Sequence, residues 1–199
     1  CPIANVRLEY DESGNQTGQF VSCLEDKLFQ PAGFNWRAKY DKGNLVEKVY
    51  LNNVKEPYLN PNEGYAKYIA KYNERGRLIE LSFFDTEEKP CLNNKGYAKV
   101  SYGYDEWGNV TEILFLGVDG KPCTDSSGVA RCVMRYDERG NKIEEATSDT
   151  EGNPCLNAQG AAKMTAVCDS WGNVTEMTYW GTDGRLGLNK EGFAKLNFK

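Results

Sequence analysis

A short block of sequence recurs along this chain with a fixed step of 32 residues. Each copy has the form Gly-x-Ala-Lys or Gly-x-Ala-Arg. A constant period of this length indicates one supersecondary unit copied end to end, so the structure of the whole chain follows from that of one repeat. The glycines that open the copies are Gly64, Gly96, Gly128, Gly160 and Gly192.

Two further motifs keep this step and complete the repeat. Copies of Tyr-Asp-Glu-x-Gly-Asn, some of them worn or shortened, occur at residues 10–15, 40–44, 72–77, 104–109, 136–141 and 168–173. A third motif, Asp-Gly-Lys-Pro-Cys or a variant of it, ends at Cys91, Cys123 and Cys155. We therefore interpret residues 1–199 as a single tandem-repeat array of about six units plus a terminal strand. Because the chain opens and closes on the same strand of the repeat, we expect it to be a segment of a longer protein.

Within one repeat, two-residue alternation predicts two β-strands, at residues 97–104 and 110–117 in the best-preserved copy. The segment between them is typical of a hairpin loop with a bulge, because its Asp can bond the turn backbone and its Gly accepts a positive φ. The proline of the third motif cannot donate to a ladder, so it ends the second strand. We predict an all-β fold of tandem β-hairpins, with about two antiparallel strands per 32-residue unit, forming one continuous curved or spiral sheet.

The same alternation assigns side chains to the two faces of this hairpin. One face is expected to hold Ala98, Val100, Tyr102, Tyr104, Val110, Glu112, Leu114 and Leu116. The other face is expected to hold Tyr97, Lys99, Ser101, Thr111, Ile113 and Phe115.

The bulk composition argues against several classes of partner. Lys and Arg number 24 against 29 Asp and Glu, the net charge is −5, and histidine is absent. Affinity for a phosphate backbone needs concentrated cations, so we expect no nucleic-acid partner. No apolar run approaches the roughly 20 residues that cross a bilayer, so we expect no membrane span.

No cofactor or metal site is predicted either. Histidine ligands and the Cys-x-x-Cys spacing of zinc sites are missing, and so is a glycine-rich phosphate loop. The Asp-rich turns raise the alternative of calcium, but their spacing matches neither the EF-hand loop nor the nonapeptide roll, and turns need Asp and Gly for backbone reasons alone.

A glutamate recurs three residues after the last residue of the Tyr-Asp motif. Paired carboxylates could serve acid–base chemistry, but an active site is needed once, whereas this residue is repeated. We therefore interpret it as a hydrogen-bonded structural residue, for instance with Tyr102 opposite Glu112, and predict that the chain is not an enzyme. The glutamates are Glu47, Glu80, Glu112, Glu144 and Glu176.

The chain has seven cysteines, an odd number, so at least one thiol is unpaired within it. If each repeat adds two strands, equivalent cysteines lie about 2 × 4.8 Å apart, beyond the reach of a disulfide. If each repeat is one coil of a solenoid, they stack at about 4.8 Å and could pair. We favour free, half-buried thiols that act as small apolar residues.

The strongest candidate for binding is a stripe of cations that alternates with aromatic residues. On a regular array these side chains line up on one Lys/Arg-aromatic face, which could hold an acidic peptide or a carboxylate-bearing glycan. The alternative is a sheet face on which lysine stems cover aromatic rings. The residues of the stripe are Tyr65, Lys67, Tyr97, Lys99, Val129, Arg131, Ala161, Lys163, Phe193 and Lys195.

The recurrent Tyr-Asp-x-x-Gly-Asn after an alternating strand resembles the YD repeats of bacterial RHS proteins. The likeness covers nearly the whole chain, through the Tyr-Asp pairs that begin at Tyr10, Tyr40, Tyr104 and Tyr136 and their turn glycines. RHS proteins are large surface or secreted proteins whose repeats wind as a β-sheet shell around a toxin domain. The resemblance implies a bacterial, secreted or cell-surface scaffold. The chain departs from the family pattern in its longer repeat, its Gly-Lys-Pro-Cys-Leu-Asn segment and its frequent cysteines.

Two functions follow as hypotheses. The first is a non-enzymatic β-repeat scaffold that binds a protein or glycan ligand on the Lys/Arg-aromatic face. The second is a structural spacer or shell segment of a larger protein whose function lies in other domains. Binding should depend on Lys99, Arg131 and Lys163, whereas a spacer should tolerate their reversal to glutamate.

Overall fold

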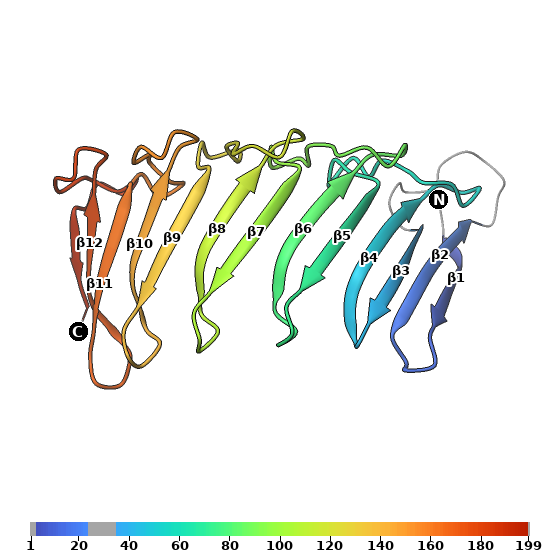
Figure 1. Ribbon diagram of the computed structural model, residues 1–199, viewed down its shortest axis with the longest axis horizontal. Coiled ribbons are helices and arrows are strands. Elements are labelled where there is room, and N and C mark those ends of the chain that lie inside the picture. The colour runs from blue at the N-terminus through green and yellow to red at the C-terminus, as the bar shows by residue number, and fades with distance from the viewer. Residues whose placement is uncertain (1–2, 24–34, 199) are drawn as a thin grey trace. The chain divides into compact units, whose positions relative to one another are not determined.

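The computed structural model describes residues 3–23 and 35–198, and within these ranges the chain contains β-strands and no helix (Figure 1). The predicted all-β fold of antiparallel hairpins, with two strands in each repeat, is confirmed. The strands are β1 Ile3–Tyr10, β2 Gln16–Cys23, β3 Asn35–Asp41, β4 Asn44–Leu51, β5 Lys67–Tyr72, β6 Leu78–Phe84, β7 Lys99–Tyr104, β8 Val110–Leu116, β9 Arg131–Tyr136, β10 Lys142–Ser148, β11 Lys163–Cys168, β12 Val174–Trp180 and β13 Lys195–Asn197.

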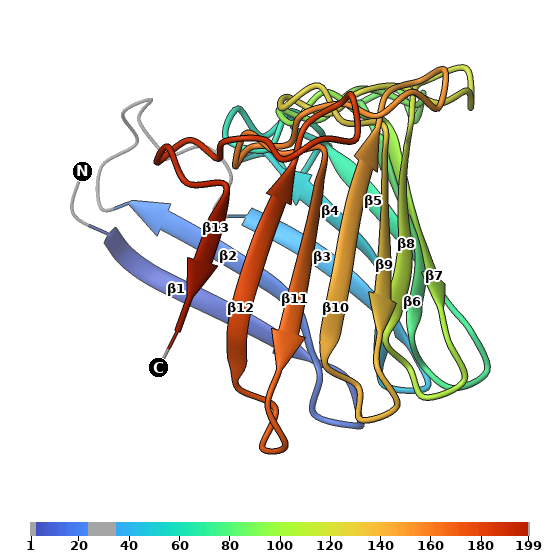
Figure 2. The same cartoon turned by 90° about the vertical axis from the view of Figure 1, so that its left-hand side faces the viewer.

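The chain forms two compact modules, an N-terminal one of residues Cys1–Asn94 and a C-terminal one of residues Lys95–Lys199. Within the N-terminal module each strand from β1 to β6 pairs antiparallel with its neighbours in the chain. The same holds from β7 to β13 in the C-terminal module. Figure 2 shows β10 to β13 side by side in one layer. Hairpin neighbours thus lie adjacent in space, as local connections favour.

The hairpin turns have the predicted chemistry. In the turn between β9 and β10, the Asp137 carboxylate accepts hydrogen bonds from the backbone N–H groups of Arg139 (3.0 Å) and Asn141 (2.8 Å). The side-chain amide of Asn141 donates a further bond (2.9 Å) and, with these contacts, holds the pKa of Asp137 below its ordinary value. Gly140 has φ +85°, the left-handed conformation that glycine adopts at least cost.

A bulge in the second strand follows each of these turns and changes which side chains share a face. Between β7 and β8 the register shifts at Gly103 and Tyr104, so that Val100 lies opposite Phe115 and Lys99 opposite Leu116. The predicted pairing of the two faces across this hairpin is therefore wrong. Because side chains alternate with a period of two, the one extra residue of a bulge exchanges the faces of everything beyond it.

The alanine of the Gly-x-Ala block joins three strands. Ala130 donates its N–H to Ser148 at the end of β10 (2.9 Å), and its carbonyl accepts from Phe115 in β8 (2.9 Å). Ala66 and Ala162 make the equivalent two bonds. Their side chains are 0–3% exposed, so a residue larger than alanine has no space at this position.

Backbone hydrogen bonds between the segments that connect successive hairpins join some repeats to the next at the edge of the sheet where the Gly-x-Ala blocks lie (the rim). Asn94 donates its N–H to the carbonyl of Glu63 (2.9 Å), and three repeats later Lys190 donates its N–H to the carbonyl of Gln159 (2.8 Å). In the C-terminal module Ser126 also donates to Lys95 (2.7 Å). Among the described residues the equivalent bond between residues 127 and 158 is missing. The tied loops pass close to the glycines that open the repeats, and a Cβ on Gly64 would lie 2.7 Å from the Asn94 backbone nitrogen.

The third motif ends the second strand of the repeat, as predicted. After β8 the chain turns at Gly117–Gly120 and returns beside the strand, with Pro122 bridged to Leu116. The cysteines that follow this proline are free and half-buried, and burial raises the pKa of the Cys91 and Cys123 thiols. The expectation of free thiols is confirmed for the five cysteines whose side chains are described, Cys91, Cys123, Cys132, Cys155 and Cys168. Cys1 and the side chain of Cys23 lie outside the described part.

Candidate binding surface

The cations and the aromatic residues of the predicted stripe lie on opposite faces of the sheet. The ring of Tyr65 packs on Phe83, with 4.7 Å between ring centroids, whereas the Lys67 ammonium lies 5.3 Å from the ring centroid of Phe84. Phe83 and Phe84 are consecutive in β6 and so project from opposite faces. The chain bends at Ala66, between the aromatic residue and the cation. Because of this bend, residues two apart no longer project from the same face of the sheet. The predicted Lys/Arg-aromatic face is therefore wrong as a single surface.

Most aromatic and apolar members of the stripe belong to the core. Tyr65, Tyr97, Val129 and Ala161 are each less than one-tenth exposed, whereas Phe193 is 47% exposed. Tyr97 stacks on Phe115 with 4.5 Å between ring centroids. In the N-terminal module burial raises the pKa of Tyr65 and Tyr68, that of Tyr68 to about 12. These phenols therefore stay protonated at neutral pH and act by packing.

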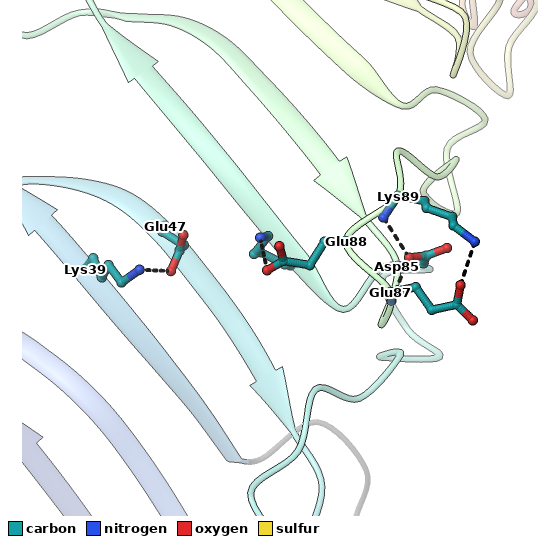
Figure 3. A network of polar contacts seen from close by, with 7 residues as sticks. Lys39, Glu47, Asp85, Glu87, Glu88 and Lys89 are labelled. Carbon is teal, nitrogen blue, oxygen red and sulfur yellow. Dashed lines mark hydrogen bonds and ion pairs between the residues drawn. The ribbon is translucent and has the colours of Figure 1, made fainter.

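In the N-terminal module the repeating glutamates pair with a lysine on the preceding strand of their own hairpin. Glu47 lies 2.7 Å from the Lys39 ammonium, and Glu80 lies 2.8 Å from Lys71. Lys67 instead pairs with Glu88, 2.6 Å away on the loop after β6. Figure 3 shows the Lys39–Glu47 pair and the cluster of Asp85, Glu87, Glu88 and Lys89 on that loop.

In the C-terminal module the partner of the repeating glutamate depends on one strand position. Glu144 keeps a partner on its own hairpin, with Arg135 at 3.6 Å. Two other hairpins have Gly103 and Val167 where that cation would stand. Their glutamates pair with the Gly-x-Ala cation of the following hairpin, Glu112 with Arg131 (2.5 Å) and Glu176 with Lys195 (2.8 Å). The expected hydrogen bond from Tyr102 to Glu112 is wrong, because the bulge places Glu112 opposite Gly103.

Lys163 differs from these cations. Its ammonium lies 4.9 Å from the ring centroid of Trp180, and the ion pairs among the described residues give it no carboxylate. Lys163 lies opposite Ala146 on one side and Trp180 on the other. Together with Arg131, Ser148 and Thr182 it lines a hollow of about 360 Å³. This hollow can accept an anion, since it offers one ammonium without an acidic partner beside an aromatic ring.

The sequence patterns missed three kinds of residue at this surface. Trp180 lies outside every motif, and only the strand register brings it beside Lys163. The buried alanines of the repeat are the same residue in every copy of the Gly-x-Ala block, but the sequence did not indicate their burial, which depends on the bend before each strand. Trp107 and Trp171, at two hairpin tips, occupy the variable position of the Tyr-Asp-Glu-x-Gly-Asn motif, and the motif gave no reason to single them out.

No cluster of three or more Cys, Asp or Glu side chains in residues 3–23 and 35–198 is arranged to hold a metal ion. Across the same residues, no helix has the length and apolar character needed to cross a membrane.

Comparison with known proteins gives a likeness of fold. No protein-family model and no curated protein sequence matches the chain. Among solved structures, the chain resembles part of TcdB2-TccC3-Cdc42, with a TM-score of 0.53 and 15% identity over 96% of this chain and 8% of that chain. Two further matches are TcdB2-TccC3 without its hypervariable C-terminal region (TM-score 0.48, 15% identity, 96% and 8% coverage) and the Tc holotoxin pore of Photorhabdus luminescens (TM-score 0.41, 13% identity, 96% and 9% coverage).

The first of these matches shows a shared β-repeat fold at low sequence identity. This chain spans 8% of the length of that matched chain. The hairpin array is thus a fold that also occurs as a small part of a much larger polypeptide.

Proposed function

We propose that this chain is a non-enzymatic β-repeat segment of a larger bacterial protein of the RHS/YD type, and that its main role is structural. The ion pairs that the repeating glutamates form within the chain support this role most directly. Each repeating glutamate forms an ion pair with a cation of its own or the following hairpin. A catalytic carboxylate is needed once and must be available to a substrate, whereas these pairs are rebuilt from hairpin to hairpin. The likeness of fold to a segment of TcdB2-TccC3 is consistent with this role.

A structural repeat should tolerate a change in repeat number. Deletion of residues 129–160 removes β9 and β10 and joins Gly128 to Ala161, which restores the Gly-x-Ala-Lys block. We expect this variant to keep the β-sheet circular dichroism signal per residue and to unfold cooperatively in urea, because repeat stability is nearly a sum of neighbour terms. In the shortened array Lys163 should take the place of Arg131 beside Glu112.

The control is a deletion of residues 129–144, half a period, which destroys the register of the following hairpin. It should lose the part of the β-sheet signal that comes from the hairpins beside the deletion, whereas the full-period deletion should keep it. If the full-period deletion also failed to fold, the hairpins would not be interchangeable and the structural proposal would be wrong.

The hollow beside Lys163 supports a second candidate function, the binding of a protein or glycan ligand through a carboxylate. All five cations of the predicted stripe occupy the same repeat position. Lys67, Arg131 and Lys195 each form an ion pair with a glutamate, whereas the contact of Lys163 among the described residues is with the Trp180 ring. An ammonium over an indole keeps its charge and can receive a carboxylate or the acidic group of a glycan.

This candidate is tested with Lys163→Met, which keeps the apolar stem over Trp180 and removes the charge. Titration calorimetry with an oligogalacturonate and with a glutamate-rich peptide should show binding to the wild-type chain. We expect the affinity to fall about tenfold in the variant, the size of one partly desolvated charge contact. Lys195→Met is the matched control, since Lys195 already pairs with Glu176. Equal losses in both variants would indicate general charge attraction and contradict a site at Lys163.

A further inference from the structure

Two tryptophans occupy the tips of hairpins in the C-terminal module. Trp107 lies in the turn between β7 and β8 and is 72% exposed, and Trp171 lies in the turn between β11 and β12 and is 85% exposed. Both stand at the variable position of the Tyr-Asp-Glu-x-Gly-Asn motif, two repeats apart. Tryptophan is enriched at protein interfaces and among the residues that contribute most of their binding energy.

The turn itself does not require tryptophan. The same position holds Ser13, Arg75 and Arg139 in other copies of the motif. The turn of Ser13 keeps the same contact as that of Trp171, since each donates its backbone N–H to the motif aspartate at 2.9 Å. The fold therefore accepts a small polar residue, and the indole contributes little that the turn needs.

Two neighbouring tips of the module, residues 137–141 and 169–173, are joined by side-chain contacts. Arg139, on the tip between the two tryptophans, donates a hydrogen bond of 2.7 Å to the backbone carbonyl of Ser170 on the next tip. The side chain of Asn141 reaches close to Gly172 of that tip as well. Four strand steps of about 4.8 Å separate Trp107 from Trp171, a span of about 19 Å. A surface whose parts are fixed in advance loses little conformational entropy on binding.

The charge around the indoles has one prevailing sign. Turn residues 105–109, 137–141 and 169–173 carry five carboxylates and one cation, Arg139. Glu106 and Glu138 are exposed beside the row of tips. An indole face and a carboxylate both attract cations, and a guanidinium can stack on the first while it pairs with the second.

We propose that this tryptophan ledge, formed by Trp107 and Trp171 with Glu106 and Glu138 beside them, binds an extended arginine-rich segment of a partner protein. An extended chain covers about 19 Å with about six residues, so alternate side chains of such a segment reach both indoles. Charge complementarity favours this partner over an acidic or neutral one. The ledge lies on the hairpin tips, so it is separate from the hollow at Lys163 and does not depend on it.

The test uses a fluorescein-labelled peptide of about eight residues in which arginine and serine alternate, with binding followed by fluorescence anisotropy. The variant Trp107→Ser/Trp171→Ser keeps the net charge and introduces the residue found at position 13. We expect it to lose affinity by about tenfold or more, the combined effect of two cation–π contacts. Trp107→Phe/Trp171→Phe retains aromatic faces and should recover part of the affinity. Unchanged circular dichroism establishes that the variants fold.

Each other result would overturn the proposal. Equal binding of the peptide to the wild-type chain and the serine variant would mean attraction by net charge alone. Absence of peptide binding, or capture of a neutral glycan or a phosphatidylcholine vesicle in its place through the same tryptophans, would mean that the partner has a different chemistry.

Discussion

Replacing Gly64 with alanine is expected to lower the free energy of unfolding of the N-terminal module by about 3 kcal/mol, through strain in the left-handed conformation and overpacking. Gly64 has φ +83°, and a Cβ there would meet the backbone nitrogen of Asn94 at 2.7 Å and its side-chain oxygen at 2.5 Å. The backbone nitrogen cannot move away without breaking its bond to the Glu63 carbonyl. Urea unfolding followed by circular dichroism measures the effect.

Gly128→Ala is the matched control for this change. Gly128 has the same place in the repeat and φ +87°, but a Cβ there would meet nothing within 4 Å. Its loss should be about 1 kcal/mol, the conformational cost alone. Equal losses of unfolding free energy for the two substitutions would contradict a contribution from the close approach of the next loop. The φ angles alone would then explain the glycines.

The second large effect is expected for Tyr97→Ala, with a loss of about 3 kcal/mol in the free energy of unfolding of the C-terminal module. Tyr97 is 9% exposed and its ring lies 4.5 Å from that of Phe115. The substitution leaves a cavity at the start of the hairpin, where the sheet has one layer and few side chains could fill it. Thermal and urea unfolding of the same sample provide two readings of the change.

Phe193→Ala controls for the loss of an aromatic ring at this repeat position. Phe193 is 47% exposed, so its removal should cost about 0.5 kcal/mol, as for most surface substitutions. A loss at Tyr97 no greater than that at Phe193 would contradict a packing role for Tyr97. The tyrosine would then be better explained by the ligand contact that the sequence predicted.

The fold was predictable because each local signal agrees with the period. The Asp137 turn contains its own cap and its own glycine, so a few residues determine the hairpin without help from the rest of the chain. Within each module the fixed step then places a hairpin next to the preceding one. Sequence alone was enough for these two levels.

The faces were not predictable by counting alternate residues. The bulge near Tyr104 adds one residue to β8, and the bend at Ala66 separates Tyr65 from Lys67. Both features are changes of backbone conformation, so the alternation of apolar and polar residues in the sequence does not reveal them. Two one-residue displacements thus removed the predicted stripe while leaving the strands correct.

The partner of each repeating glutamate depends on a residue of another strand that the repeat consensus does not record. Glu112 and Glu176 differ from Glu144 because of Gly103 and Val167, which are departures from the consensus on another strand. A consensus averages such departures away, whereas the partner of each charge depends on them. Candidate binding residues in a repeat protein are therefore better sought where the consensus fails, as it does for the ring beside Lys163.

Among the described residues, no backbone hydrogen bond joins residues 127 and 158, and this has a consequence for how an array of this kind could be lengthened. At Gly64 and Gly160 an inserted loop would have to displace a neighbouring backbone group. At Gly128 the space is open, and extra residues would break no bond to the next hairpin. This step of the array is consequently the natural point of entry for a grafted epitope or an accessory domain.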